Sequence, residues 1–270
     1  PENQLLVSEG SQLIRIPLNG AASTTLLSDD SGYLKDVTSC EQGRSIALAH
    51  VSFGQDKGFR VWKANGDGSQ PKAITPNSTG LMFWFCSADG KYFYYSDYSK
   101  SSGILRGTAS GDGEEVIPGT ALKNTILRGA TLSPDQKTTA LFLECFAPET
   151  RSYKNRILLM PVDGDSGKSG RYLDIDPRFD VVFVSPGPTS RGNFRFTPDG
   201  RALAFVREES GVSNVYLLPL TGAAPTKLTD FKSETILDFG WSADGKQLAV
   251  LRLASVNDII LMHETNSSAQ

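Results

Sequence analysis

One short turn recurs along the chain at a nearly constant spacing. Its carboxyl-terminal glycine, or the residue in that place, stands at positions 43, 90, 136, 200 and 245, which lie 47, 46, 64 and 45 residues apart. Four copies are clear and a fifth is degenerate: Ser87-Ala88-Asp89-Gly90-Lys91, Ser133-Pro134-Asp135-Gln136-Lys137, Thr197-Pro198-Asp199-Gly200-Arg201, Ser242-Ala243-Asp244-Gly245-Lys246 and Cys40-Glu41-Gln42-Gly43-Arg44. The chain is therefore expected to repeat one structural unit every 45 or so residues.

The chemistry of the turn identifies that unit as a β-hairpin. Proline presets φ at the second position, aspartate accepts a local backbone N–H at the third, and glycine supplies the positive φ that closes the turn. Short runs rich in Val, Ile, Leu, Phe and Tyr lie between the turns, without helical periodicity. A mid-forties period is typical of a β-propeller blade. We predict an all-β propeller of four-stranded antiparallel blades, six most likely in number, with five or seven as alternatives.

The ends of the chain leave ring closure open. Residues 4–28 are expected to supply strands two to four of a repeat, and the last repeat shows strands one to three, the third over 258–263. The two ends could share one blade, or a segment upstream of Pro1 could add another. We expect residues 1–264 to form a single propeller domain and residues 265–270 a disordered tail.

Composition excludes some partners. The formal net charge is −3, which gives no electrostatic reason to expect nucleic acid or an anionic membrane as partner. The apolar runs are far shorter than the roughly 18 residues of a membrane-spanning helix.

The odd count of three cysteines leaves at least one thiol unpaired. Cys40 and Cys86 are expected near the same end of neighbouring first strands, where they could pair, but small buried hydrophobic residues are the preferred interpretation.

The last two repeats carry a family resemblance. The motifs Thr197-Pro198-Asp199-Gly200-Arg201, Leu228-Thr229-Asp230-Phe231, Phe239-Gly240-Trp241-Ser242 and Asn257-Asp258-Ile259-Ile260-Leu261 resemble the TolB-like and WD-repeat-like β-propellers, most closely those at the C-terminal ends of bacterial (acidobacterial) membrane-bound Ser/Thr kinases and winged-helix regulators. The resemblance implies a sensor or interaction role, an extracytoplasmic, periplasmic setting and a place in a longer membrane-anchored protein. It carries no catalytic residues. The turn at Gln136 and an insertion near 176–191 depart from the pattern.

Enzyme signatures are weak in this sequence. There is no Gly-x-Ser-x-Gly elbow, and the only histidines, His50 and His263, are expected at or beside strand ends, where a lone histidine is more often packed or solvated than catalytic. We expect no catalytic residue, cofactor or metal site. The alternative is a propeller hydrolase or lyase with a charged site in the central channel, built from Arg128, Arg151, Arg191, Glu149 and Asp238.

Topology predicts where a binding site would lie. In a four-stranded antiparallel blade the tight Asp-Gly turns share one face, and the two-to-three loops and blade connections share the other. Variable loops on a rigid scaffold commonly carry binding sites. We therefore predict a non-catalytic platform that recognises a peptide, protein or small ligand on the variable-loop face. Its candidate residues are Arg151, Tyr153, Arg191, Phe231, Lys232 and Tyr98, aromatic and cationic side chains of the kind that anchors a peptide or protein partner.

Overall fold

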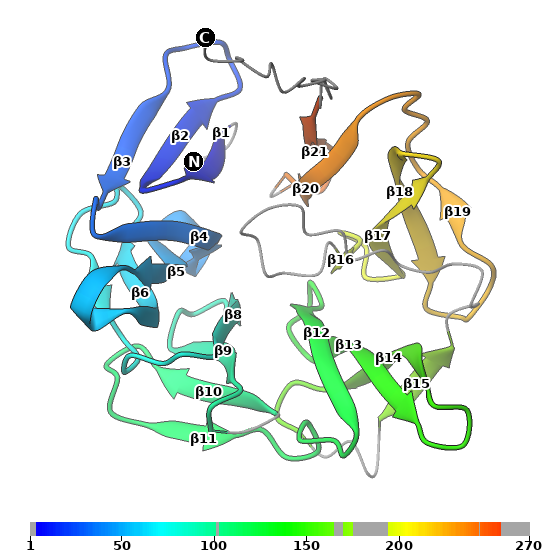
Figure 1. Ribbon diagram of the computed structural model, residues 1–270. Coiled ribbons are helices and arrows are strands. Elements are labelled where there is room, and N and C mark those ends of the chain that lie inside the picture. The colour runs from blue at the N-terminus through cyan, green and yellow to red at the C-terminus, as the bar shows by residue number, and fades with distance from the viewer. Residues whose placement is uncertain (1–3, 101–102, 165–169, 175–193, 243, 255–270) are drawn as a thin grey trace, which may run out of the picture.

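The fold is a ring of antiparallel β-sheets around a central axis (Figure 1). The computed structural model describes residues 4–100, 103–164, 170–174, 194–242 and 244–254. Besides strands, this part of the chain contains two short 3-10 turns, Glu41–Gly43 and Gly54–Asp56. The predicted all-β propeller is confirmed. The described residues contain no helix with the length and apolar character that a membrane crossing requires.

Four sheets are complete blades of four strands, and in each the strands are hydrogen-bonded in chain order. The first strand of each blade lies next to the central axis (Figure 1). The strands are β4 (Gly32–Cys40), β5 (Ser45–Ser52), β6 (Gly58–Asn65) and β7 (Lys72–Ala73); β8 (Leu81–Cys86), β9 (Tyr92–Asp97), β10 (Ile104–Thr108) and β11 (Glu114–Val116); β12 (Thr125–Leu132), β13 (Thr138–Ala147), β14 (Ser152–Pro161) and β15 (Arg171–Asp174); β16 (Phe194–Phe196), β17 (Ala202–Glu209), β18 (Val212–Pro219) and β19 (Thr226–Lys227).

Two further sheets come from the ends of the chain. The N-terminal sheet has three strands, β1 (Gln4–Glu9), β2 (Gln12–Pro17) and β3 (Thr24–Ser28), and the last sheet has two described strands, β20 (Thr235–Trp241) and β21 (Leu248–Leu253). The described residues thus form five blades of three or four strands, one of the alternatives to the six expected, plus this two-stranded sheet. The predicted third strand over 258–263 and the predicted tail over 265–270 lie outside the described residues.

The recurring turns have the predicted backbone. Gly90, Gly200 and Gly245 have φ of 65°, 68° and 71°, and Gln136 adopts the same conformation at 62°. The Asp89 carboxylate accepts the backbone N–H of Lys91 at 3.1 Å. The structure adds a second interaction, because the hydroxyl at the first turn position donates to that aspartate in all four clear copies.

Successive turns also touch one another around the ring. A Cβ built on Gly245 would lie 2.5 Å from Cβ of Pro198, the second residue of the preceding turn, and one on Gly90 would meet the Glu41 side chain. At Gly200 the nearest atom would be Cδ of Pro134, at 3.7 Å. The five turns therefore form a connected series in which the glycine position of one turn faces the second position of the turn before it.

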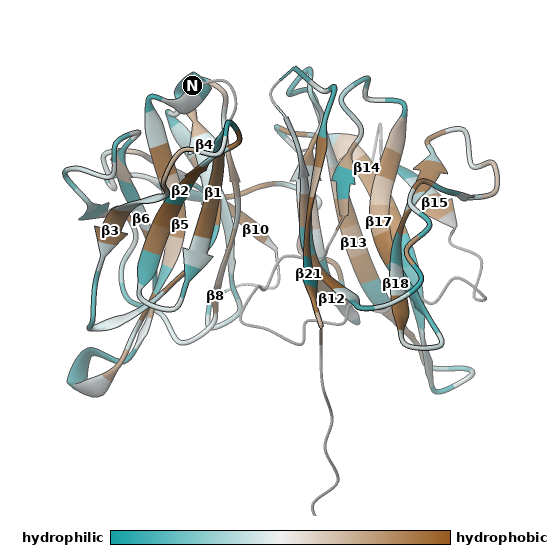
Figure 2. Ribbon diagram, turned by 90° about the horizontal axis from the view of Figure 1, so that it is seen from above, coloured by the Kyte–Doolittle hydropathy of each residue, from teal (hydrophilic) through white to brown (hydrophobic). Residues whose placement is uncertain are grey.

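In the described part of the chain, the hydrophobic core is divided into five clusters, each between two neighbouring sheets. Alternate side chains of a strand enter different clusters, so Leu141 and Leu143 pack towards the β8–β11 blade while Ala140 and Phe142 pack towards the β16–β19 blade. In Figure 2 the strands are largely hydrophobic and many loops at the rims are hydrophilic. This alternation is what a blade buried on both faces requires.

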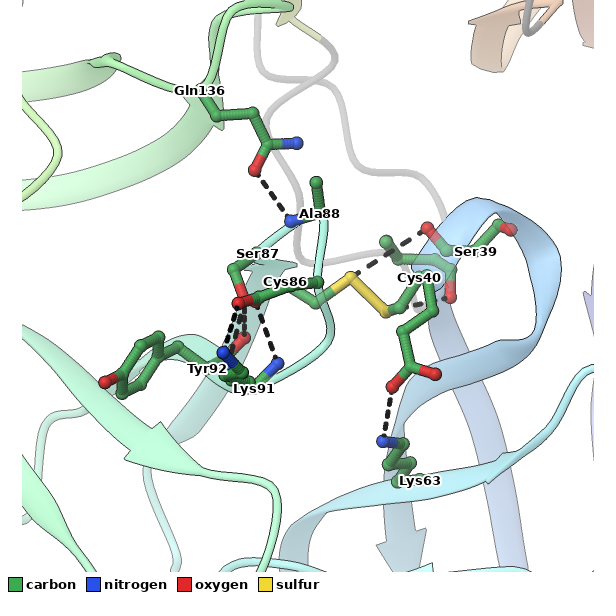
Figure 3. Close-up of a disulfide and its surroundings, with 12 residues drawn as sticks. Ser39, Cys40, Lys63, Cys86, Ser87, Ala88, Lys91, Tyr92 and Gln136 are labelled. Carbon is green, nitrogen blue, oxygen red and sulfur yellow. Dashed lines mark hydrogen bonds and ion pairs between the residues drawn. A yellow bond between two sulfur atoms is a disulfide. The ribbon is translucent and has the colours of Figure 1, made fainter.

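Cys40 and Cys86 form a disulfide bond, which corrects the preferred interpretation of two unpaired buried thiols. The bond joins the ends of β4 and β8, the first strands of adjacent blades, with their Cα atoms 6.1 Å apart (Figure 3). Both residues are buried, at 2% and 8% exposure, so their burial was predicted correctly. The third cysteine, Cys145, is free and half-buried.

Candidate functional site

The structure separates the two ends of the propeller as the topology predicts. We call the end with the Asp-Gly turns the turn face, and the end with the two-to-three loops and blade connections the loop face. On the loop face of three blades, a residue at the end of the second strand is hydrogen-bonded through its backbone to the segment that precedes the first strand. The bonds run from Phe53 N–H to Ser31 O, from Tyr98 N–H to Gly80 O and from Phe146 N–H to Asn124 O. The loop face is therefore anchored to the blades by a repeated backbone contact.

The β13–β14 hairpin carries three aromatic or cationic side chains on this face. Tyr153 is 56% exposed, and its ring centroid lies 5.2 Å from that of Phe146 on the opposing strand. Arg151, in the turn between the strands, has a positive φ of 50° and is exposed. A paired aromatic surface beside an exposed guanidinium can offer both apolar contact and forked hydrogen bonds to a partner.

The connection between β19 and β20 carries Phe231 and Lys232. The Arg252 guanidinium stacks over the half-buried Phe231 ring, 4.0 Å from its centroid. The buried side chain of Asn214 holds this connection, because its Oδ1 accepts the Phe231 N–H at 2.7 Å and the Thr229 hydroxyl at 3.0 Å. Lys232 is exposed and forms an ion pair with Asp230. Phe231 is thus a fixed surface element.

Tyr98 follows β9, and the residue is 40% exposed. Its hydroxyl is turned inward and donates to the Leu127 carbonyl, which links two blades, and burial raises the pKa of Tyr98 to about 12. Arg191, the remaining candidate, lies outside the described residues. The five described candidates fall at three separate places on the loop face: β9–β10, β13–β14 and β19–β20. Within the described residues, no hydrogen bond, ion pair or aromatic contact joins one of these places to another, so they form scattered anchors instead of one compact site.

Sequence reasoning missed an aromatic pair on the same face. Tyr33 at the start of β4 and Phe53 after β5 are 47% and 48% exposed, and their rings meet edge to face with centroids 4.5 Å apart. Such a pair contributes about 0.5–1.5 kcal/mol beyond its area burial. Nothing local in the sequence indicated that Tyr33, twenty residues before Phe53, would pack against it.

His50 is packed, as predicted for a lone strand histidine. It is 2% exposed, stacks on Trp62 with ring centroids 4.2 Å apart, and its Nε2 lies 3.3 Å from Oδ2 of Asp29. Burial lowers the pKa of His50, and the charge of Arg60 adds to that effect, while Asp29 opposes it. His263 lies outside the described residues.

The charged residues proposed for a channel enzyme do not converge among the described residues. Nε of Arg128 donates to Glu144 at 2.7 Å, and Asp238 is paired with Arg195 at 2.8 Å. Glu149 and Arg151 lie in the turn between β13 and β14, and not on the first strands β12 and β20, which carry Arg128 and Asp238. No group of three or more His, Cys, Asp or Glu side chains capable of holding a metal ion occurs in the described part of the chain.

The turn face contains a cavity of about 510 Å³ between the N-terminal sheet and the β4–β7 blade. Its two arginines already have structural partners. Arg15 donates to the Gly66 carbonyl at 2.7 Å, and Arg44 donates to the Glu41 carbonyl at 3.3 Å. The cavity is lined by Gln4, Arg15, Gly43, Arg44, Asn65, Gly66 and Asp67. The Arg15 contact, together with the hydrogen bond from the Gly66 N–H to the Arg44 carbonyl at 2.7 Å, holds the 65–69 turn in place.

Comparison with known proteins supports the fold. No protein-family profile and no curated protein sequence matches the chain. Solved structures do match. A putative TolB from Agrobacterium tumefaciens has a TM-score of 0.68 at 17% identity, covering 94% of this chain and 87% of its own. TolB from Acinetobacter baumannii has a TM-score of 0.59 at 16% identity, covering 88% of this chain and 53% of its own.

Other matching structures differ in function. A chain of the nidogen/laminin complex matches with a TM-score of 0.59 at 15% identity, covering 92% of this chain and 85% of its own. An enzyme, the oligogalacturonate lyase of Vibrio parahaemolyticus, matches with a TM-score of 0.53 at 13% identity, covering 91% of this chain and 77% of its own. These likenesses establish a propeller fold similar to that of TolB structures, and no activity follows from them.

Proposed function

We propose that the chain is a non-catalytic recognition propeller that binds a peptide or protein segment on its loop face. One observation carries the proposal: aromatic side chains are exposed at several places on this face while their backbone is held by the blades. Tyr33 with Phe53, and Tyr153 with Phe146, form two such pairs. Rigid aromatic side chains lose little conformational entropy on binding, which makes them efficient anchors.

The cations beside these rings define the partner further. Arg151 is exposed and stands two residues before Tyr153 in the chain, whereas Arg252, which stacks on Phe231, is already paired with Glu234 at 2.8 Å. Guanidinium groups bind carboxylates through two parallel hydrogen bonds. The proposed partner is therefore an extended segment with apolar or aromatic side chains and at least one acidic group.

The proposed setting is extracytoplasmic, with a sensor role in a longer membrane-anchored protein. The resemblance to kinase- and regulator-associated propellers motivates this setting, and the Cys40–Cys86 disulfide supports it, since disulfides persist in oxidising compartments and are rare in the cytosol. Expression with and without export, followed by thiol titration, tests the setting independently of the partner.

A display selection tests the recognition surface. The immobilised protein is used to select peptides from a random library, and the best peptide is measured by fluorescence anisotropy against Tyr153→Ala, Phe53→Ala and Phe231→Ala. The matched control is Tyr92→Ala, because Tyr92 is 38% exposed on the turn face and carries its own stacked guanidinium from Arg106.

We expect each loop-face variant to weaken binding by about tenfold or more, as truncation of an anchor residue does. Tyr92→Ala should bind as the parent does, and all variants should keep the parent's circular dichroism. If Tyr92→Ala abolishes binding while the three loop-face variants retain it, recognition takes place on the turn face and the proposal is wrong.

A further inference from the structure

The turn-face cavity contains two arginines that form no ion pair with the described residues. Arg15 stands on β2, and Arg44 follows the first recurring turn. Each uses one nitrogen to bind a backbone carbonyl, that of Gly66 for Nη2 of Arg15 and that of Glu41 for Nε of Arg44. In the described part of the chain, Nη1 of Arg15 and both Nη atoms of Arg44 have no hydrogen-bond partner. These nitrogens are available to an anion.

Arg106 shows what an arginine in this position binds at another junction. It stands two residues before the end of β10, as Arg15 stands two residues before the end of β2, and it reaches the turn that follows β14 in the next blade. Its guanidinium is bound there by two carboxylates, with Nε donating to Glu115 at 2.6 Å and Nη1 to Asp163 at 3.0 Å. At Arg15 the corresponding turn supplies the Gly66 carbonyl instead. An external anion can therefore take the role of these two carboxylates in the cavity.

The cavity is large enough for an organic molecule, and its lining is polar. Its volume of about 510 Å³ falls within the roughly 300–1,000 Å³ of small-molecule sites. Besides the two arginines, the lining consists of Gly43, Gly66, Gln4, Asn65 and Asp67. Small-molecule sites are usually lined by hydrophobic and aromatic side chains, and this cavity has none. Its ligand should consequently carry hydrogen-bonding groups over most of its surface.

Asp67 adds an acceptor to the cations. Its Oδ1 accepts the Ser69 N–H at 2.9 Å and the Ser69 hydroxyl at 2.6 Å, and no residue in the described chain donates to its Oδ2. The hydrogen bonds from Ser69, with the charge of Arg15, lower the pKa of Asp67, so its carboxylate is ionised at neutral pH. An ionised carboxylate accepts hydrogen bonds from hydroxyl groups and repels a second anion. A ligand that suits both Asp67 and the arginines has an anionic group and hydroxyl groups in separate places.

We propose that the turn-face cavity binds a small hydroxylated oxyanion, a sugar phosphate or a sugar acid. The phosphate or carboxylate group lies between Arg15 and Arg44, whose guanidinium groups form strong, forked hydrogen bonds to such anions. Hydroxyl groups donate to Asp67 and bind the amides of Gln4 and Asn65. The site lies at the opposite end of the propeller from the loop face, so it is independent of the recognition surface proposed above.

Isothermal titration calorimetry on the intact protein tests the ligand class with four probes. Glucose-6-phosphate and glucuronate carry a phosphate or a carboxylate on the same ring, glucose lacks the anion, and inorganic phosphate lacks the hydroxyl groups. We expect at least one anionic sugar to bind with a Kd of about 1 mM or lower, and glucose and inorganic phosphate to bind about tenfold more weakly or worse. The anionic sugar that binds more tightly identifies the anionic group. Equal affinity for glucose, or no binding of either anionic sugar at about 20 mM, would overturn the proposal.

Arg44 offers a variant with a matched control. Arg44→Gln removes a guanidinium whose one protein hydrogen bond is to the Glu41 carbonyl, so the fold should persist while the anionic sugar binds about tenfold more weakly or worse. Arg44→Lys keeps the charge without the fork and should lose less. Arg201→Gln is the control, because Arg201 is exposed at the same position of another recurring turn, and its carbonyl accepts the Leu220 N–H as that of Arg44 accepts the Gly66 N–H. Full affinity in Arg44→Gln, or an equal loss in Arg201→Gln, would overturn the proposal.

Asp67 distinguishes a hydroxylated ligand from a bare anion. Asp67→Asn keeps an acceptor for Ser69 and removes one negative charge, so inorganic phosphate should bind more tightly. The anionic sugar loses a charged acceptor for its hydroxyl groups, so its preference over inorganic phosphate should fall about threefold or more. Circular dichroism and Tm equal to those of the parent check the fold of the variant. An unchanged or larger preference for the anionic sugar would overturn the proposal.

Discussion

The side-chain oxygen of Gln136 accepts a hydrogen bond from the backbone N–H of Ala88 at 2.7 Å, although 48 residues separate them. The contact joins the turns of two adjacent blades, and Figure 3 shows it above the disulfide. It also explains the one clear turn that lacks glycine. The second residue of the preceding turn is the small Ala88, which leaves room for a side chain at 136 and offers that side chain a donor.

The contacts between turns predict that substitutions at equivalent turn positions change the free energy of unfolding by different amounts. Gly245→Val should reduce the free energy of unfolding by roughly 1–3 kcal/mol, because it places a β-branched residue at φ 71° and its Cβ 2.5 Å from Pro198. Gly200→Val meets the same backbone strain, but its nearest atom is 3.7 Å away, so it should lose less. Gln136→Gly should change stability by at most about 1 kcal/mol, since relief of the left-handed backbone offsets the lost hydrogen bond. Urea unfolding measures all three. Equal losses at 136 and 245 would contradict the packing of the turns.

The disulfide predicts that replacing its two cysteines lowers the free energy of unfolding substantially. Cys40→Ser with Cys86→Ser should cost about 2–4 kcal/mol, because the bond closes a loop across a sequence separation of 46 and restricts the unfolded chain. Cys145→Ser, at the free cysteine, is the control and should unfold as the parent does. Guanidinium unfolding with and without reductant checks this. A parent protein that loses no stability on reduction would exclude the bond as a stabilising element.

His50 predicts a pH dependence of stability. Its folded-state pKa lies below the ordinary value near 6.5, so the unfolded chain binds the proton more readily and protonation favours unfolding. The contribution of neutral His50 to the free energy of unfolding is complete above about pH 6.5 and is lost as the pH falls through the folded-state pKa. Tm should therefore fall between about pH 7 and 5 in the parent and in His263→Gln, and fall less in His50→Gln. Calorimetry across this range decides it, and parallel curves for all three proteins would contradict the assignment.

Asn214 predicts a coupling between the core and the loop face. Asn214→Ala should destabilise the protein by about 1–3 kcal/mol, because the Phe231 N–H and the Thr229 hydroxyl lose a buried acceptor. Exchange of backbone amides at 229–232 should accelerate, with β12–β14 unchanged. Lys232→Ala, whose exposed ion pair with Asp230 contributes little, is the matched control. Uniform acceleration throughout the chain would indicate general destabilisation instead.

The sequence predicted what depends on local chemistry. The glycines of the turns need positive φ, and the aspartates bind the N–H two residues on, so the turns, their period and the propeller could be derived from residues close together in the chain. The position of the loop face was predicted from the strand order of an antiparallel blade. The number of blades could not be predicted, because it depends on how the two ends of the chain meet, which no local pattern specifies.

Contacts between residues of different elements could not be predicted from the sequence. Cys40 and Cys86 could be placed near the same end of neighbouring strands, but whether their sulfur atoms meet depends on the angle between two blades. Tyr33 and Phe53 meet because β4 pairs antiparallel with β5, which places Tyr33 opposite Val51, two residues before Phe53. The stacking of Arg252 on Phe231 likewise joins residues from different elements. Such contacts follow from the assembled ring.

The disulfide also determines how the molecule would respond to tension. If the chain is pulled from its two ends, force passes from Cys40 to Cys86 through the sulfur atoms, and the intervening segment with β5, β6 and β7 carries no load. These three strands of the blade are shielded, while β4, which ends at Cys40, extends with the rest of the chain. The unfolded contour should be shorter by roughly 150 Å than that of the reduced protein, at about 3.3–3.6 Å per residue. An oxidised molecule would thus keep an unstretched loop in the middle of an otherwise extended chain.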